Sequence, residues 1–263
     1  MSRVSVARVR LGSEIHAPLC RLAHELVGLS GWRRYGVAFL LGVSAVATLP
    51  PVDLSPLLVV AFSGLLWLDE GSSGPSASFG LGYAFGFGFF VAGLYWISGA
   101  LFVDIATFWW LVPIAAAGLP AVFALYAGIA LLATNLATNH LRLSGTARVF
   151  GFAIAWTAAE WIRGHAFTGL PWNLIGSTWS GDFPGAIAVL QCVAWIGIYG
   201  LSFLTVLAAS LPALLGASSL VPISECRRWM PAIAAALLVL VPGVSGAVRL
   251  EMSPITTGEI WLR

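Results

Sequence analysis

The residues of this sequence that are best suited to chemistry stand together between residues 159 and 181. Glu160 and Arg163 are three positions apart at the end of an apolar run, a spacing that places both side chains on one face of a helix. One interpretation is a structural ion pair, which lowers the cost of holding two charges near lipid. The other is that Arg163 binds a lipid phosphate through two hydrogen bonds while Glu160 orients it. The residue types favour neither.

The segment that follows this pair predicts a compact loop in place of a continued helix. The run from Gly169 to Trp172 contains Pro171, which donates no backbone hydrogen bond and biases the residue before it toward extended geometry. Trp172, with Asn173, Thr178 and Trp179 after it, makes the loop amphipathic, and indole rings favour the headgroup level of a bilayer. We therefore expect an outward-facing loop at the membrane interface, which acts either as an anchor only or as a binding surface.

Other side chains capable of nucleophilic or metal chemistry lack partners at a useful spacing. Cys20, Cys192 and Cys226 form no C-x-x-C pair, so neither a disulfide framework nor a thiolate zinc site is predicted. His140 and His165 have no carboxylate or second ligand at a motif spacing. We expect no catalytic residue, no metal site and no cofactor within this sequence.

The elements that position these residues must be membrane helices. Of 263 residues, 59% are hydrophobic and 9% are charged, whereas soluble domains have about 25% charged residues. Backbone groups in hydrocarbon must pair within the protein, and the apolar runs lack the alternation of barrel strands. The predicted fold is therefore an all-α, polytopic helical bundle. A net charge of +2 is too small to indicate a nucleic-acid partner.

Seven apolar stretches predict about seven transmembrane helices. They cover residues 35–50, 54–68, 79–101, 111–137, 147–162, 185–215 and 230–248. The first two are shorter than the roughly 20 residues of a straight crossing, and Pro50 and Pro51 lie between them. We expect these two to form a tight, tilted or shallow hairpin. Counts of six or eight are the alternatives.

Residues 1–34 predict a cytoplasmic arm in front of the bundle. They contain six Arg and two Glu, and leucines from Leu19 to Leu29 recur at helical spacing, which predicts a short amphipathic helix on the membrane surface. With the N-terminus inside, ten Arg lie in cytoplasmic segments and three lie outside, in agreement with the positive-inside rule. The bundle then covers residues 35–248, and residues 249–263 form a tail on the outer face.

Small and aromatic residues are concentrated in the stretch 79–101. Gly82 and Gly86 share one helix face, and Gly88 lies on another, with Trp96 among the aromatic residues around them. Small residues at this spacing let membrane helices approach closely. Helix packing is the main interpretation, and an aromatic-walled groove for acyl chains is the alternative.

Three stretches together resemble the apolipoprotein N-acyltransferase family. Residues 160–172 read Glu-Trp-Ile-Arg-Gly-x-x-x-Thr-Gly-Leu-Pro-Trp and are similar to the signature of that family. Residues 82–96 look like its third span, and residues 197–203 look like its sixth. The resemblance covers the sequence from about residue 35 onward.

This resemblance implies a multi-pass protein of the bacterial inner membrane that transfers an acyl chain from a phospholipid to the N-terminal amine of a diacylglyceryl-cysteine lipoprotein. In that family a periplasmic nitrilase-like domain after the seventh span carries a Glu-Lys-Cys triad, in which the thiolate takes the acyl group, Glu is the general base and Lys stabilises the oxyanion. The residues expected to contact substrate here are Glu160, Arg163, Gly169, Pro171, Trp172 and Trp96.

The sequence gives no counterpart of that triad. Residues 258–263 are similar to the start of the first strand of the nitrilase-like domain, and the 263 residues contain no Lys. We expect this chain to bind phospholipid and lipoprotein acyl chains but to be inactive alone, and a split enzyme with a separately encoded nitrilase-like half is one form of this hypothesis. The rivals are a noncatalytic membrane scaffold and a small transporter, which needs polar groups near the midplane of several spans, where we find Gln191.

Overall fold

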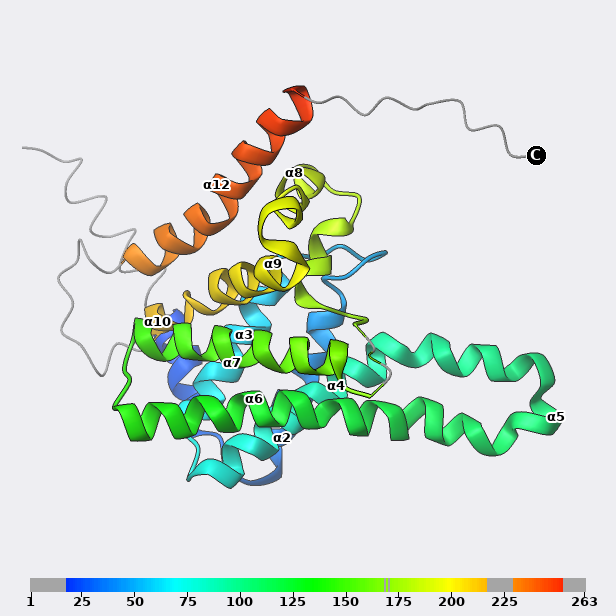
Figure 1. Ribbon diagram of the computed structural model, residues 1–263. Helices are drawn as coiled ribbons and strands as arrows, with labels where there is room; N and C mark the ends of the chain where they lie inside the picture. The colour runs from blue at the N-terminus through cyan, green and yellow to red at the C-terminus, as the bar shows by residue number, and fades with distance from the viewer. Residues whose placement is uncertain (1–17, 168, 170, 217–228, 253–263) are drawn as a thin grey trace, which may run out of the picture.

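A computed structural model of the chain describes residues 18–167, 169, 171–216 and 229–252 (Figure 1). Within these ranges every regular element is a helix, which confirms the predicted all-α class. Three predicted features lie outside the described residues: the first half of the cytoplasmic arm (residues 1–17), the tail from residue 253 onward, and Cys226.

The helices follow one another closely. After a helix over residues 18–28, the elements are α2 (Gly31–Val46), α3 (Leu57–Glu70), α4 (Pro75–Leu101), η1 (Phe102–Asp104), α5 (Ile105–Phe108), η2 (Trp109–Leu111), the π-helix η3 (Ile114–Gly118), α6 (Leu119–Leu141), α7 (Thr146–His165), η4 (Ile175–Ser180), α8 (Ala186–Leu190), α9 (Val193–Ser210), α10 (Ala213–Gly216) and α12 (Met230–Met252).

Four of the described stretches are long and apolar enough to cross a membrane: Pro75–Leu111, Ile114–Leu141, Val193–Gly216 and Met230–Met252. Helices α2 and α3 occupy the positions of the first two predicted spans but have only 16 and 14 residues. Helix α7 occupies the fifth predicted position. A membrane bundle is therefore supported, while the count of seven crossings stays a prediction.

Helix α3 lies at the centre of the hydrophobic core. Its residues from Ala61 to Asp69 are all buried, and Phe62 is fully enclosed by aromatic rings. The Phe62 ring lies 5.7 Å from Phe85 of α4 and 5.0 Å from Trp156 of α7, measured between centroids. The Trp156 ring meets Phe62 edge to face, and the Phe85 ring is tilted by 36°. Offset rings in such arrangements attract one another, so one side chain joins three helices.

Helix α4 packs between α2 and α6 through its glycines. A Cβ atom at Gly82 would lie 2.5 Å from the Ala127 carbonyl oxygen of α6, and one at Gly86 would lie 2.7 Å from the Ala127 methyl group. On the other face, a Cβ atom at Gly88 would collide with the Phe39 backbone of α2. The predicted close packing is confirmed, and the alternative of an acyl groove at these faces is wrong because two helices fill them.

The helix over residues 18–28 packs against the end of the bundle. Ala23 is 3% exposed, and the Cys20 Sγ lies 3.8 Å from the Leu215 carbonyl oxygen of α10. The helix predicted here is therefore formed. Leu26 and Leu29 are half-buried against the core, whereas Leu22 is 47% exposed, and the position of this helix on a membrane surface stays a prediction.

The sixth predicted span, residues 185–215, is not one continuous helix. It divides into α8, α9 and α10, and Gly197 within α9 has φ 67° and ψ 173°. Glycine adopts positive φ without the steric penalty of other residues, so the chain turns there. Helix α12 packs against α8 and α9 and crosses the bundle obliquely (Figure 1).

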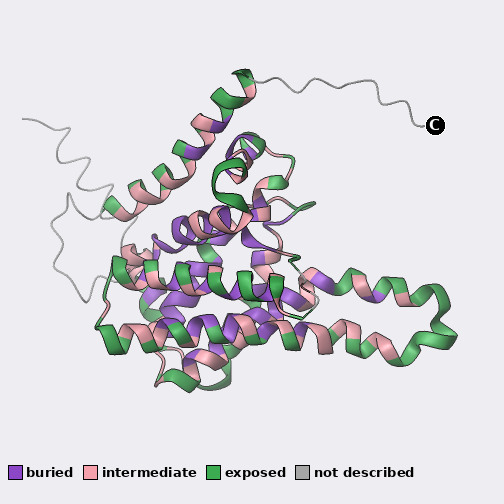
Figure 2. Ribbon diagram, viewed as in Figure 1, coloured by how far each residue is buried: buried purple, intermediate pink, exposed green. Residues whose placement is uncertain are grey.

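Helices α4 and α6 continue past the rest of the bundle as a hairpin, which we call the α4–α6 arm (Figure 2). Its outer part runs through η1, α5, η2 and η3, and none of these four elements has a buried residue. Val103 at the tip is 90% exposed. Apart from the exposed Asp104, the α4–α6 arm is apolar, and within the described protein its tip packs only on itself.

Candidate functional site

Two charged side chains from the last turns of α7 hold the loop that follows this helix. The Arg163 Nη1 donates a hydrogen bond of 2.7 Å to the Trp172 carbonyl oxygen. The Glu160 Oε1 accepts hydrogen bonds from the Ile175 backbone N–H at 2.9 Å and from the Trp156 indole at 3.3 Å. One helix face thereby fixes the loop at two points, because the spacing of the two residues directs both side chains toward it.

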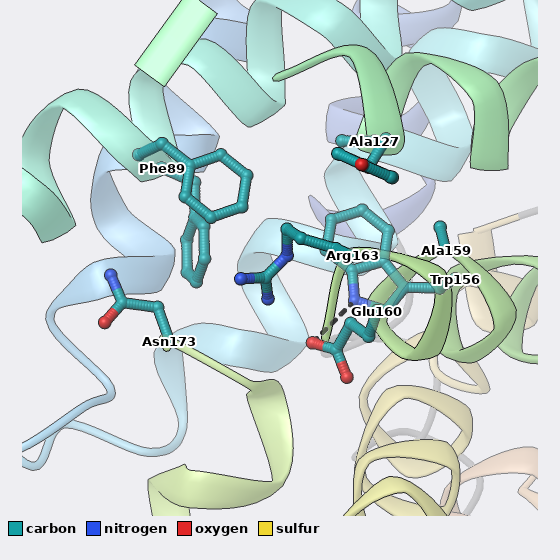
Figure 3. A pocket seen from close by; sticks show the side chains of 9 residues that line it. Phe89, Ala127, Trp156, Ala159, Glu160, Arg163 and Asn173 are labelled. Carbon is teal, nitrogen blue, oxygen red and sulfur yellow. Dashed lines mark hydrogen bonds between the residues drawn. The ribbon is translucent and has the colours of Figure 1, made fainter. Parts of the chain in front are cut away.

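Both charges are buried within a small aromatic pocket (Figure 3). Arg163 is 3% exposed and Glu160 is 5% exposed. The Arg163 guanidinium lies over the Phe90 ring at 5.1 Å and over the Phe123 ring at 5.8 Å. Desolvated cation–π contacts and the attraction between the two opposite charges offset part of the cost of burying them. The remaining lining residues are Phe89, Tyr126, Ala127, Trp156, Ala159 and Asn173.

The second half of the loop enters the interior as η4. Its Gly176 backbone N–H donates to the Ser202 hydroxyl at 2.8 Å, and the Trp179 indole donates to the Thr205 hydroxyl at 2.8 Å. Irregular backbone is tolerated in a membrane bundle only where protein groups satisfy its hydrogen bonds, and here α7 and α9 supply those groups.

This arrangement corrects one part of the predicted interfacial surface. Thr178 is fully buried, and its hydroxyl lies 3.3 Å from the hydroxyl of Thr48, in the turn after α2. Trp179 is half-buried. Thr178 therefore faces the interior, and the Trp179 indole is tied to Thr205 of α9, while an interfacial role of the partly exposed Trp179 ring stays a prediction.

The first half of the loop faces outward and is aromatic. The Trp172 ring packs on the Trp96 ring of α4 with 4.8 Å between centroids, and the two are 44% and 49% exposed. Next to them, the Asn173 amide lies against α4 where a Cβ atom at Gly93 would collide with it. We call Trp96 and Trp172 the tryptophan pair. It joins the end of α4 to the loop and leaves both indole rings open.

The backbone of the outer half is shaped by two further predicted site residues. Gly169 has φ 68°, and a Cβ atom there would lie 2.5 Å from the Gly164 carbonyl oxygen, so this turn requires glycine. Pro171 is exposed beside Trp172. Together they bring the chain back across the end of α7.

Among the described residues of this site, no nucleophile lies next to a base. Within the described ranges, no group of three or more His, Cys, Asp or Glu side chains could hold a metal ion. His165, also on α7, stacks on the Trp161 ring with 4.5 Å between centroids and bonds the Trp161 carbonyl oxygen through Nδ1 at 2.7 Å. His165 thus contacts an aromatic ring and a backbone carbonyl of its own helix.

Comparison with known families agrees with this geometry. Residues 41–211 match the model of the apolipoprotein N-acyltransferase N-terminal domain. The chain belongs to this family. The matched range includes α7, the loop, η4 and the tryptophan pair, so every residue of the pocket lies within the part of the chain that characterises apolipoprotein N-acyltransferases.

Individual relatives carry the same family name. Apolipoprotein N-acyltransferase of Rhodopseudomonas palustris is 36% identical over 90% of this chain and 43% of its own length. Those of Brucella melitensis and Bradyrhizobium diazoefficiens are 41% and 38% identical over 75% and 90% of this chain, and over 37% and 43% of their own lengths. The chain therefore spans about two fifths of the length of these relatives.

The structure brings all six predicted site residues to one end of the bundle, and it adds others. Glu160 and Arg163 lie inside, while Trp96, Gly169, Pro171 and Trp172 surround them on the outside. Sequence reasoning missed Phe90 and Phe123, which flank the guanidinium. Neither has a sequence signal of this role, because both stand among many aromatic residues in apolar stretches. Asn173, which the sequence predicts in the outward-facing loop, lines the pocket.

Proposed function

We propose that this chain is the membrane part of an enzyme that transfers an acyl chain from a phospholipid to the N-terminal amine of a diacylglyceryl-cysteine lipoprotein. Its own role is to bind acyl chains of the phospholipid donor and of the lipoprotein. The family assignment supports the reaction, and the exposed tryptophan pair supports the binding role.

The tryptophan pair is the observation that carries this proposal. Two indole rings that are half open at the end of an apolar bundle offer a rigid apolar surface with polar edges, suited to the boundary between acyl chains and headgroups. Arg163 fixes the backbone of Trp172 from inside at 2.7 Å. Glu160 and Arg163 thus serve substrate binding by positioning the loop, and Gly169 and Pro171 set its path.

The pocket behind the pair offers one further contact for a polar headgroup. The Asn173 side-chain nitrogen is buried there without a hydrogen-bond acceptor, and an unsatisfied buried donor is costly. An ester or phosphate oxygen of a bound lipid would satisfy it. We therefore propose that the headgroup end of the substrate lies next to Asn173 and its acyl chains along the outer faces of Trp96 and Trp172.

The chemistry itself is assigned to a nitrilase-like domain that supplies Glu, Lys and Cys. The 263 residues contain no Lys, so the oxyanion-stabilising residue has to come from elsewhere. That domain acts from the outer face, either in the same polypeptide or as a separately encoded partner. We place the chain in the bacterial inner membrane with seven crossings and a cytoplasmic N-terminus, which puts the tryptophan pair outside.

Complementation tests this proposal. In cells depleted of their own enzyme, the chain alone should not restore N-acylated lipoproteins, whereas the chain produced with the nitrilase-like domain of a full-length relative should restore them. Trp172→Ala should then lower the rate of N-acylation about tenfold, on the order of one lost stacking surface. Trp32→Ala is the matched control, because Trp32 is 79% exposed in α2 and belongs to no part of the site.

The outcomes separate the parts of the proposal. N-acylation by the chain alone would overturn the assignment of catalysis to another domain. Equal activity of the Trp172→Ala and Trp32→Ala variants, at equal protein levels, would overturn the binding role of the tryptophan pair. Failure of the combined polypeptides, with both present in the membrane, would argue against the enzyme as a whole.

A further inference from the structure

Arg34 is a buried cation at the end of the bundle opposite the tryptophan pair. It lies in the first turn of α2 and is 7% exposed. Its Nε and Nη2 atoms are buried without a hydrogen-bond partner. Guanidinium N–H groups that are removed from water normally bond an acceptor, because the desolvation cost is otherwise not recovered. The position therefore calls for an oxygen-bearing partner.

The surroundings of Arg34 explain why the charge is tolerated and why it lacks a partner. A Cβ atom at Gly71 would collide both with the Arg34 Nη2 and with the Val27 carbonyl oxygen, so the guanidinium lies where the helix over residues 18–28 and helix α3 both end. Helix C-termini carry partial negative charge. They favour a cation here, but within the described protein they offer Nε and Nη2 no hydrogen bond.

The nearby carboxylate is already used by another cation. Asp69 in the last turn of α3 pairs with Arg148 of α7 at 2.8 Å and accepts a hydrogen bond from the Ser78 hydroxyl. Its side chain is 1% exposed. Among the described residues this is the ion pair at this end of the bundle, and Arg34 takes no part in it.

We propose that Arg34 binds the phosphate group of an anionic phospholipid in the leaflet at this end of the bundle. A phosphate presents several oxygens to the planar fork of a guanidinium, and basic positions between membrane helices on the cytoplasmic side are suited to anionic headgroups. Arg33, the preceding residue of α2, is exposed, whereas Arg34 is 7% exposed, so Arg34 is the desolvated cation of these two neighbours.

This site is separate from the proposed acyl-donor surface. The tryptophan pair lies near the end of α4, whereas Gly71, against which Arg34 packs, precedes the start of α4. The lipid at Arg34 holds the end of the 18–28 helix against α2 and α3 and is not consumed. Loss of one site would leave the other in place.

Lipid titration of the purified chain in phosphatidylcholine nanodiscs tests the proposal. The probe is phosphatidylglycerol with a spin-labelled acyl chain, and the immobilised fraction of the label is measured. We expect saturable immobilisation of one lipid per protein. Arg34→Gln should weaken this affinity about tenfold, the order expected for a lost charged hydrogen bond. Arg33→Gln is the matched control and should change the affinity less than about twofold. Arg34→Lys, which keeps the charge but not the fork, should fall between them.

The controls identify the source of the phosphate and keep the test valid. Inorganic phosphate added to several millimolar should not displace the labelled lipid, and displacement would instead assign the site to a free anion. Immobilisation that does not saturate in the unsubstituted chain, or equal loss in the Arg33→Gln and Arg34→Gln variants, would overturn the proposal, since either result means unspecific charge attraction. The unsubstituted titration stands even if Arg34→Gln fails to fold.

Discussion

Replacing Arg163 with Met removes the cation that fixes the outer loop. The lost hydrogen bond to the Trp172 carbonyl oxygen, 2.7 Å long, corresponds to about 1.5–3 kcal/mol because the donor is charged. The desolvated contacts with the Phe90 and Phe123 rings add about 0.5–2 kcal/mol. Glu160, 5% exposed, is left without its counter-charge. We expect a loss of about 2–5 kcal/mol, the sum of the hydrogen bond and the ring contacts.

Reversible unfolding in mixed micelles, followed by circular dichroism as the SDS fraction rises, measures this loss. Glu160→Gln and the double variant complete the cycle. Gln still accepts from the Ile175 N–H, so the double variant should be more stable than the sum of the two single losses predicts, by about 1–3 kcal/mol. Additive losses, or an Arg163→Met variant within about 1 kcal/mol of the unsubstituted chain, would refute the reasoning that the two charges act as one unit.

Three further predictions use the same unfolding assay. Gly82→Ala should destabilise the chain by about 1–2 kcal/mol, since overpacking against the α6 backbone outweighs the helix propensity of Ala; Gly99→Ala, in open space on the same helix, should be neutral or stabilising, and equal effects would contradict the packing described. Asp69→Asn should cost about 3 kcal/mol, because it leaves Arg148 without its buried partner, and a cost that disappears in high salt would mean that the pair is solvated. Trp179→Phe should cost about 1 kcal/mol through the lost indole hydrogen bond, and no change would mean that η4 is held by its backbone alone.

Local features of the site were predictable from the sequence. The end of α7 at His165 follows from the glycine and proline after it, and the shared face of Glu160 and Arg163 follows from helical spacing. The packing of Gly82 and Gly86 against α6 was predictable for the same reason, since small residues four apart form a flat helix face.

Contacts between distant segments could not be predicted. Thr178 resembles an interfacial residue in sequence, but its burial depends on Thr48, which is 130 residues away. The flanking of the guanidinium by Phe123 depends on how α6 lies against α7. Arg34 was counted with a polar arm because charge in a short segment usually means solvent exposure, whereas α2 begins at Gly31 and carries Arg34 inside.

The length of the α4–α6 arm determines how the protein can adapt to bilayers of different thickness. The 27 residues of α4 correspond to about 40 Å of helix, whereas the hydrocarbon of a typical bilayer is about 30 Å thick. Most helices forced into such hydrophobic mismatch must tilt, or the bilayer must stretch. The α4–α6 arm carries one charge, Asp104 near its tip, so a few more of the apolar turns before Asp104 can enter the hydrocarbon at little cost. The end of the bundle that carries Arg34 and Arg148 should therefore keep a constant depth in the membrane. In lipids of different chain length, the opposite bilayer surface should meet the α4–α6 arm at different points along its length.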